Sequence, residues 1–164
     1  MSLQADFSQH ETKDVLAIRK ELEEGALETN FYVRLLGLKT FDTLKLFKKI
    51  EAGLTFASFT RLQRNIGLTQ DQLGEIVQIR RRTLVRRKQA GKLEPTESDR
   101  LLRTSRVFGH ALQLFEGDGV AARTWMRSPL RALGNISPLE ACRSELGAAE
   151  VDKVIGRLEH GVFS

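Results

Sequence analysis

The residues best suited to a chemical role form a cluster of positive charge in the middle of the chain. Between Glu75 and Glu94 the sequence contains no acidic residue. Seven basic residues lie in this interval: Arg80, Arg81, Arg82, Arg86, Arg87, Lys88 and Lys92. Guanidinium groups donate hydrogen bonds in a planar fork that matches phosphates and guanine edges. Most of the net charge of +5 is therefore local, and its position favours nucleic acid as a partner.

Two short helices must position this cluster. Thr69 and Gln72 have the spacing of a capping box, so the first helix should begin directly after Thr69. Gly74 would be costly inside that helix unless another helix crosses closely over it. The second helix is predicted over residues 80–88, with Leu84 as its buried anchor.

The helical period sorts the side chains of the second helix by direction. Arg82 and Arg86 lie roughly 160° from Leu84, so they point furthest from the core. Three arginines are expected at base edges in the major groove of DNA: Arg81, Arg82 and Arg86. Two neighbours that can touch a thymine methyl are Thr83 and Val85. Phosphate contacts are expected from Gln70, Arg80, Arg87, Lys88 and Lys92. The alternative is a solvated basic face or a site for an acidic protein.

Residues 68–84 resemble the helix-turn-helix of the phage-repressor/Xre family. The resemblance is carried by LTQDQLG at residues 68–74, then Gln78-Ile79-Arg80, then Thr83-Leu84. Two positions depart from the family pattern. Gln78 stands at the turn glycine and must tolerate a left-handed backbone or change the turn, and Arg80 stands at the capping serine. The resemblance implies homodimers that read palindromic half-sites in double-stranded operator DNA.

Composition limits the fold and the location. At 164 residues the chain suits one ordinary domain or two small ones. The lack of alternating β-branched runs predicts an all-α fold. No apolar run approaches the roughly 20 residues of a membrane span, and the polar N-terminus has no signal-peptide core. With a single cysteine, Cys142, the sequence predicts a soluble cytoplasmic protein.

No pattern in the sequence predicts catalysis, a metal site or a cofactor. His10, His110 and His160 lie far apart, and no metal-ligand spacing joins them to Cys142. No glycine-rich phosphate loop follows a strand, and Ser98-Asp99 is explained by the first turn of a helix. The chain is therefore not expected to be an enzyme.

The chain is expected to divide into residues 1–38, 39–93 and 94–164. Residues 1–38 could be a docked helix, a dimer arm or a flexible extension. The lack of an obvious core partner favours the extension. Residues 39–93 form the predicted DNA-binding domain, with two more helices over 40–52 and 55–66 ahead of the helix-turn-helix.

Both of these helices carry apolar residues at helical spacing. In the first, Asp42 should cap a helix in which Leu44, Phe47 and Ile50 share one face. In the second, one face carries Phe56, Phe59, Leu62 and Ile66.

The last third of the chain is predicted to form further helices around a core. A long helix should start near Pro95, with Thr96 and Asp99 in capping spacing. Its apolar stripe comprises Leu101, Ser105, Phe108, Leu112 and Phe115. Ser137-Pro138-Leu139-Glu140 is a strong helix start, and Gly147 should separate the last helix from it.

Four segments of this region resemble, in their order along the chain, the toxin-binding domain of Xre-type antitoxins from RES–Xre (ParS-like) toxin–antitoxin modules. They lie within residues 93–103, 122–134, 137–139 and 147–161. The resemblance implies an antitoxin that neutralises a RES-domain toxin, which degrades NAD, and that represses its own operon. It also implies that the last helix and tail meet the toxin. The residues assigned to this contact are Arg157, Glu159, His160, Gly161, Val162, Phe163 and Ser164.

Three alternatives remain open from the sequence. Val162 and Phe163 could fold back onto the bundle and contact no partner. The chain could be a stand-alone repressor whose C-terminal bundle mediates dimerisation or effector sensing. It could also be a structural adaptor with an incidental basic face.

Overall fold

The computed structural model describes residues 11–161, and the regular elements in that range are all helices. The all-α prediction is confirmed; two isolated β-bridges join Thr55 to Lys92 and Leu130 to Ile136. None of the described helices has the length and apolarity to cross a bilayer. The helices are α2 (Lys13–Glu23), the 3-10 helix η1 (Phe31–Leu36), α3 (Thr43–Ala52), α4 (Phe56–Ile66), α5 (Gln70–Ile76), α6 (Arg81–Ala90), α7 (Pro95–Leu114), α8 (Gly119–Arg127), the 3-10 helix η2 (Arg131–Leu133), α9 (Pro138–Ala141) and α10 (Glu145–Glu159).

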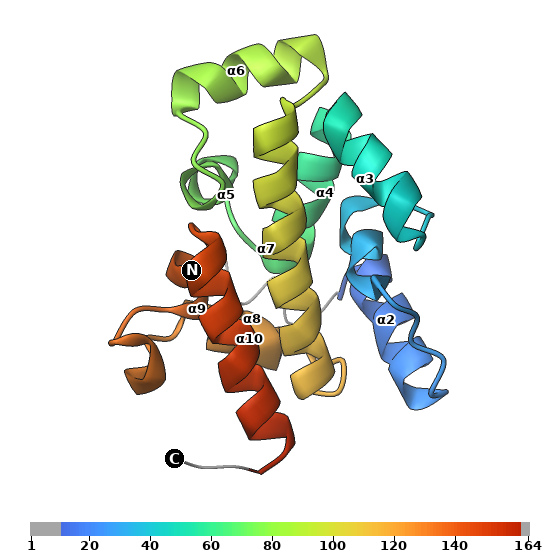
Figure 1. The fold of residues 1–164 in the computed structure, drawn as a ribbon, viewed down its shortest axis with the longest axis vertical. Coiled ribbons are helices and arrows are strands. Elements are labelled where there is room, and N and C mark those ends of the chain that lie inside the picture. The colour runs from blue at the N-terminus through green and yellow to red at the C-terminus, as the bar shows by residue number, and fades with distance from the viewer. Residues whose placement is uncertain (1–10, 162–164) are drawn as a thin grey trace.

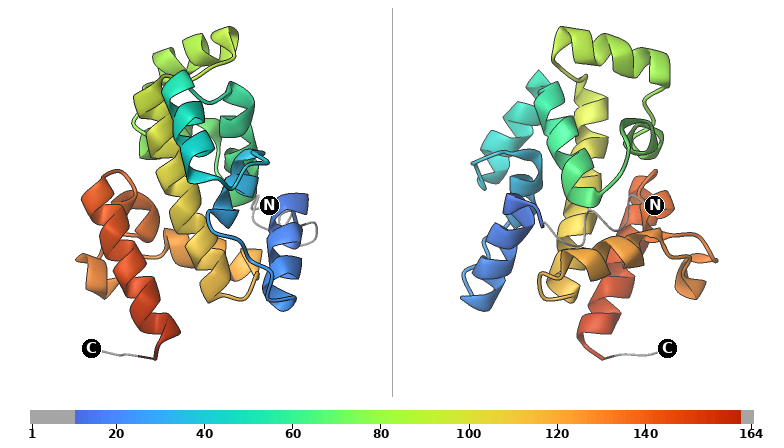
Figure 2. Two further views of the ribbon diagram at one scale, coloured as in Figure 1. Left: turned by 45° about the vertical axis from the view of Figure 1, so that its right-hand side comes forward. Right: turned by 180° about the vertical axis from the view of Figure 1, so that it is seen from behind.

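Helix α7 is the axis of the molecule. It begins next to α6 and then runs between α10 on one side and α2 with η1 on the other (Figures 1 and 2). Leu101, Phe108 and Leu112 of the predicted stripe are fully buried. The helix begins at Pro95 as expected, but Glu94 and Glu97 form the capping box instead of Thr96 and Asp99. Proline suits the first helical position because it needs no N–H partner there.

Residues 13–36 pack into the core, so the prediction of an extension is wrong for the described part of 1–38. Val15 and Ile18 of α2 and Leu35 of η1 are fully buried. Helix α7 makes room for η1, because a Cβ at Gly109 would lie 2.6 Å from the Cβ of Tyr32. The core partner lies on α7, which follows the helix-turn-helix in sequence, so local reading of residues 1–38 did not find it.

Two ion pairs also hold the N-terminal segment in place. Arg61 of α4 donates two hydrogen bonds to Asp14 of α2, at 2.8 and 2.6 Å. Burial raises the pKa of Asp14, but the bonds from Arg61 and Asn65 outweigh it and hold that pKa below its ordinary value. The buried Arg123 of α8 pairs with Glu11.

Helix α3 follows the predicted cap Asp42 and ends at Ala52 as expected, but only Ile50 of the expected apolar face packs against the core. Asp42 accepts a hydrogen bond from the Lys45 backbone at 2.9 Å, as predicted for the cap. Leu44 and Phe47, however, are 74% and 59% exposed, and Leu46 is the buried residue of this helix. The helix packs against α7. In α4, by contrast, the whole predicted face is buried: Phe56, Phe59, Leu62 and Ile66.

The C-terminal helices are tied to α7 by a buried arginine. Arg103, which is 8% exposed, donates to the carbonyls of Cys142 and Arg143 at 3.0 and 3.1 Å. It thereby satisfies carbonyls that the short helix α9 leaves without intrahelical partners. Cys142 is fully buried, and burial raises the pKa of its thiol to about 12, so the thiol stays protonated.

The predicted capping box at Ser137 and Glu140 is confirmed. The role expected for Gly147 is wrong: it lies inside the first turn of α10, whose N-cap is Ser144. A Cβ at Gly147 would overlap the Ala141 carbonyl, so glycine permits the tight packing of α9 on α10. The end of α10 is more exposed than its middle.

Candidate functional site

Helices α5 and α6 meet in the predicted helix-turn-helix geometry. The capping box is complete: the Thr69 N–H donates to Gln72 Oε1 at 2.9 Å, and the Gln72 N–H donates to Thr69 Oγ1 at 3.1 Å. Gln78 adopts the left-handed backbone that the turn requires, with φ of 57°. A Cβ at Gly74 would lie 2.5 Å from Leu84 Cδ1, so the expected close crossing of the two helices is present.

Most of the basic cluster is presented to solvent on α6. Leu84 is the buried residue of this helix, at 1% exposure, and fixes which side faces outward. The predicted DNA-contact residues that are exposed on or next to α6 are Arg80, Arg81, Arg82, Val85, Arg86, Lys88 and Lys92. Thr83 is half-buried and accepts a hydrogen bond from Arg86 at 3.3 Å. Gln70, at the start of α5, is also half-buried.

Within residues 11–161, two cations of this cluster, Arg81 and Arg87, form ion pairs. Arg81 lies 3.6 Å from Asp71 of α5, but its side chain is 86% exposed, so it can leave this weak contact. Arg87 donates from Nε and Nη2 to the two carboxylate oxygens of Glu97, at 2.8 and 3.2 Å. Its guanidinium is engaged within the protein, which argues against the phosphate contact expected of Arg87.

The surroundings of Glu97 keep its carboxylate ionised, so that it can pair with Arg87. Its side chain is only 10% exposed. Burial raises the pKa of this carboxyl, but the hydrogen bonds from Arg87 and the Glu94 backbone outweigh it and hold the pKa below its ordinary value. Glu97 is therefore an ionised partner that fixes α6 on α7.

Two further lysines extend the basic surface beyond the cluster seen in the sequence. Lys48 and Lys49 are exposed near the C-terminal end of α3. That end approaches Lys92, because a Cβ at Gly53 would lie 3.1 Å from Lys92 Cε. Sequence analysis missed them as DNA-contact candidates, although the pattern Lys45-x-x-Lys48-Lys49 was visible, because α3 was interpreted only through its apolar face.

Four of the seven predicted toxin contacts lie at or directly after the exposed end of α10. Glu159, His160 and Gly161 are exposed, and Arg157 is half-exposed. The remaining three predicted residues, Val162, Phe163 and Ser164, lie outside the described residues.

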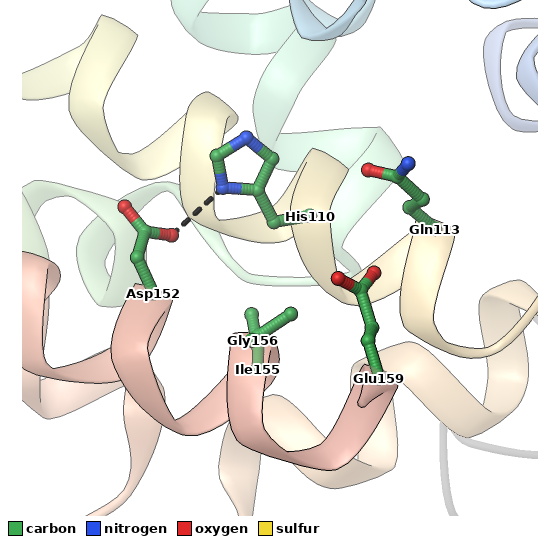
Figure 3. A pocket seen from close by; sticks show the side chains of 6 residues that line it. All are labelled: His110, Gln113, Asp152, Ile155, Gly156 and Glu159. Atoms are coloured by element: carbon green, nitrogen blue, oxygen red, sulfur yellow. Dashed lines mark hydrogen bonds and ion pairs between the residues drawn. The ribbon is translucent and has the colours of Figure 1, made fainter. Parts of the chain in front are cut away.

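A cleft of about 260 Å³ opens between α7 and α10, and sequence analysis did not foresee it. His110 and Asp152 meet at one end, where His110 Nδ1 lies 2.7 Å from Asp152 Oδ1 (Figure 3). Arg106 Nε lies 3.4 Å from the other oxygen of Asp152. Gln113 of α7 and Glu159 of α10 line the other end. The lining residues come from two helices far apart in sequence, so no local motif marks them.

Comparison with known proteins matches both halves of the described structure. Residues 46–106 match the Antitoxin Xre-like helix-turn-helix domain, and residues 110–161 match the Antitoxin Xre/MbcA/ParS C-terminal toxin-binding domain. The two matches divide within α7, so this helix belongs to both. The cleft lies entirely inside the second match.

Two relatives share the name Antitoxin Xre. The one from Yersinia enterocolitica is 36% identical over 140 residues, which cover 85% of this chain and 95% of the relative. The one from Photorhabdus laumondii is 45% identical over 74 residues, which cover 45% of this chain and 50% of the relative. The chain therefore belongs to the Xre family of antitoxins, with a helix-turn-helix domain followed by a C-terminal toxin-binding domain.

Proposed function

We propose that this antitoxin neutralises a RES-domain toxin that degrades NAD, and represses its own operon through α6. The observation that carries the proposal is the sharing of α7. One continuous helix bears the ion pair that positions α6 and the surface on which α10 packs. A chain built this way can hold DNA at one end and a toxin at the other.

The DNA half of the proposal rests on the exposed cations of α6. An α-helix fits the major groove, where an arginine fork can bond a guanine edge. Base edges are assigned to Arg81, Arg82 and Arg86, with Val85 or Thr83 near thymine methyls. Phosphates are assigned to Gln70, Arg80, Lys88 and Lys92, and Lys48 and Lys49 join this group. Two copies of the chain on a palindromic operator would place two such helices in successive major grooves.

The toxin half rests on the match of residues 110–161 and on the RES–Xre resemblance of the same region. The contact is assigned to the end of α10 and the residues that follow it. The contributing residues are Arg157, Glu159, His160, Gly161, Val162, Phe163 and Ser164. Charged side chains at an exposed helix end, such as Arg157 and Glu159, can supply contacts to a partner, and an aromatic residue such as Phe163 is a suitable interface anchor.

Co-purification with the product of the neighbouring gene tests the pairing. We expect a RES-domain protein to co-purify with this chain, and we expect the complex to consume no NAD. Release of the toxin from the complex should restore NAD consumption. A neighbour without NAD-degrading activity would overturn the RES assignment, and failure of any neighbour to bind would favour a stand-alone repressor.

Binding to the promoter fragment upstream of the gene tests the DNA half. We expect affinity to fall steeply as salt rises, because each phosphate contact releases counterions. Equal affinity for the promoter and for unrelated DNA of the same length would argue against an operator.

A further inference from the structure

Gly156 lies in the last turn of α10, which ends at Glu159, and no neighbouring segment within residues 11–161 requires a glycine there. A glycine in a helix interior lowers helix stability relative to alanine. At the other helical glycines within residues 11–161, an added Cβ would collide with a neighbouring segment. Those glycines are Gly74, Gly109, Gly119 and Gly147. At Gly156 an added Cβ would have no atom within 4 Å apart from its chain neighbours and the backbone of α10 itself.

The open space at Gly156 is the cleft between α7 and α10. Gly156 and the buried Ile155 line it together with polar side chains from both helices. Figure 3 shows Gly156 on the α10 side, between Asp152 and Glu159 along the helix. Because glycine has no side chain, an incoming group can approach the α10 backbone here more closely than at any alanine.

The two carboxylates of the cleft, Asp152 and Glu159, differ in whether they are free to bind a partner. Asp152 already contacts His110 at 2.7 Å and Arg106 at 3.4 Å. Glu159 is exposed, and the side-chain hydrogen bonds and ion pairs formed within residues 11–161 do not include it. Gln113, across the cleft, adds an amide oxygen that can accept a further hydrogen bond. The cleft therefore combines an apolar wall with hydrogen-bond acceptors and one available negative charge.

We propose that this cleft receives an arginine or lysine side chain of the toxin. The methylene stem would lie against Ile155 and the bare backbone of Gly156, and the cationic head would meet Glu159 and Gln113. Long cationic side chains bind in this way, with an apolar stem and a polar tip. The inference rests on the proposed toxin-binding function and gives it a specific contact.

Filling the cleft at Gly156 tests the proposal, because folding and binding should change in opposite directions. Gly156→Ala and Gly156→Leu should raise the midpoint of thermal unfolding of the free antitoxin, since both residues favour the helix and meet open space. The same variants should weaken binding to the co-purified toxin, by about tenfold for leucine. Wild-type binding by Gly156→Leu would overturn the proposal. A lower unfolding midpoint would show that Gly156 serves the protein's own packing, and would overturn it as well.

Removing the negative charge of Glu159 provides a second test, which does not alter the shape of the cleft. Glu159→Gln should weaken toxin binding about tenfold, and less so as salt rises. Glu150→Gln is the matched control, because Glu150 lies on the same helix outside the cleft and pairs with Lys153 at 2.9 Å. Equal affinity of Glu159→Gln and Glu150→Gln would exclude a cationic occupant.

The readouts separate this inference from the proposed function. If the wild type inhibits a RES toxin but none of the cleft variants changes affinity, the cleft inference fails and the function stands. If the co-purified partner has no NAD-degrading activity but the cleft variants weaken its binding, the RES assignment fails and the cleft inference stands.

Discussion

Arg87 of α6 and Glu97 of α7 form a two-point ion pair, with bonds of 2.8 and 3.2 Å. Glu97 Oε1 also accepts a hydrogen bond from the Glu94 backbone at 2.8 Å. One carboxylate therefore holds the basic helix in place and completes the capping box at the start of α7. Because α7 also supports α10, this pair is a direct structural link between the two functional ends of the molecule.

Replacing Arg87 should destabilise the fold more than it weakens contact with phosphates. Arg87→Met would leave the largely buried Glu97 without its charged partner, at a cost of about 1–3 kcal/mol in the free energy of unfolding. Denaturant unfolding of the free antitoxin measures this loss. The slope of the logarithm of DNA affinity against the logarithm of salt concentration should stay unchanged, because Arg87 is assigned no phosphate contact. A reduced slope with unchanged stability would restore the phosphate role.

The contribution of this pair should disappear in acid. The pKa of Glu97 is lowered on folding, so its contribution to stability is fully present above its ordinary pKa of 4.5 and is lost as pH falls through the lower folded value. The stability difference between wild type and Arg87→Met should therefore be largest near neutral pH and smallest at about pH 3. Unfolding titrations of both proteins across this range measure the difference. Asp14 titrates in both proteins, so its effect cancels.

The arginines that point outward on α6 should determine sequence preference. Arg82→Ala and Arg86→Ala should each cost about 1–3 kcal/mol of operator affinity and reduce discrimination against mutated operators. Lys88→Ala should instead weaken binding to all sequences alike and reduce the salt slope by about 1. Titrations against the operator and a scrambled fragment at several salt concentrations separate the two effects.

Lys20→Ala is the control for these variants. Lys20 is exposed on α2, which lies at the other end of the molecule from α6 (Figure 1). The Lys20→Ala substitution removes one positive charge, as Lys88→Ala does, but should leave the salt slope of DNA binding unchanged. If Lys20→Ala and Lys88→Ala behave alike, net charge governs DNA binding and the assignment to α6 is wrong.

The features that sequence analysis identified are local in the chain. The Thr69–Gln72 capping box and the left-handed Gln78 depend on residues within one or two helical turns, and the crossing at Gly74 joins two helices that follow one another directly. The features that it missed depend on residues distant in sequence. The docking of α2 and η1 on α7 and the cleft between His110 and Asp152 arise only when separate helices meet.

Arg87 shows the same limit at a single residue. The sequence assigned it to a phosphate contact, because a long side chain on this helix can extend outward. The helical period of α6 could not show that Glu97, ten residues later on the next helix, pairs with Arg87. Exposure of Leu44 and Phe47 has a similar origin, since spacing shows that a helix has an apolar face but not what covers it.

The turn between α5 and α6 offers a last prediction, because Gln78 occupies a conformation that favours glycine. Its φ is 57°, and its side chain is exposed, so it contributes little packing. Gln78→Gly should remove the steric cost of this backbone and raise the free energy of unfolding by about 0.5–1 kcal/mol. Gln89→Gly, at an exposed helical position of α6, should lower it by about 0.5–1 kcal/mol. The two variants make the same chemical change, so opposite signs in denaturant unfolding can only reflect the backbone at each site. If both variants destabilise the protein, the turn does not hold Gln78 in the left-handed conformation.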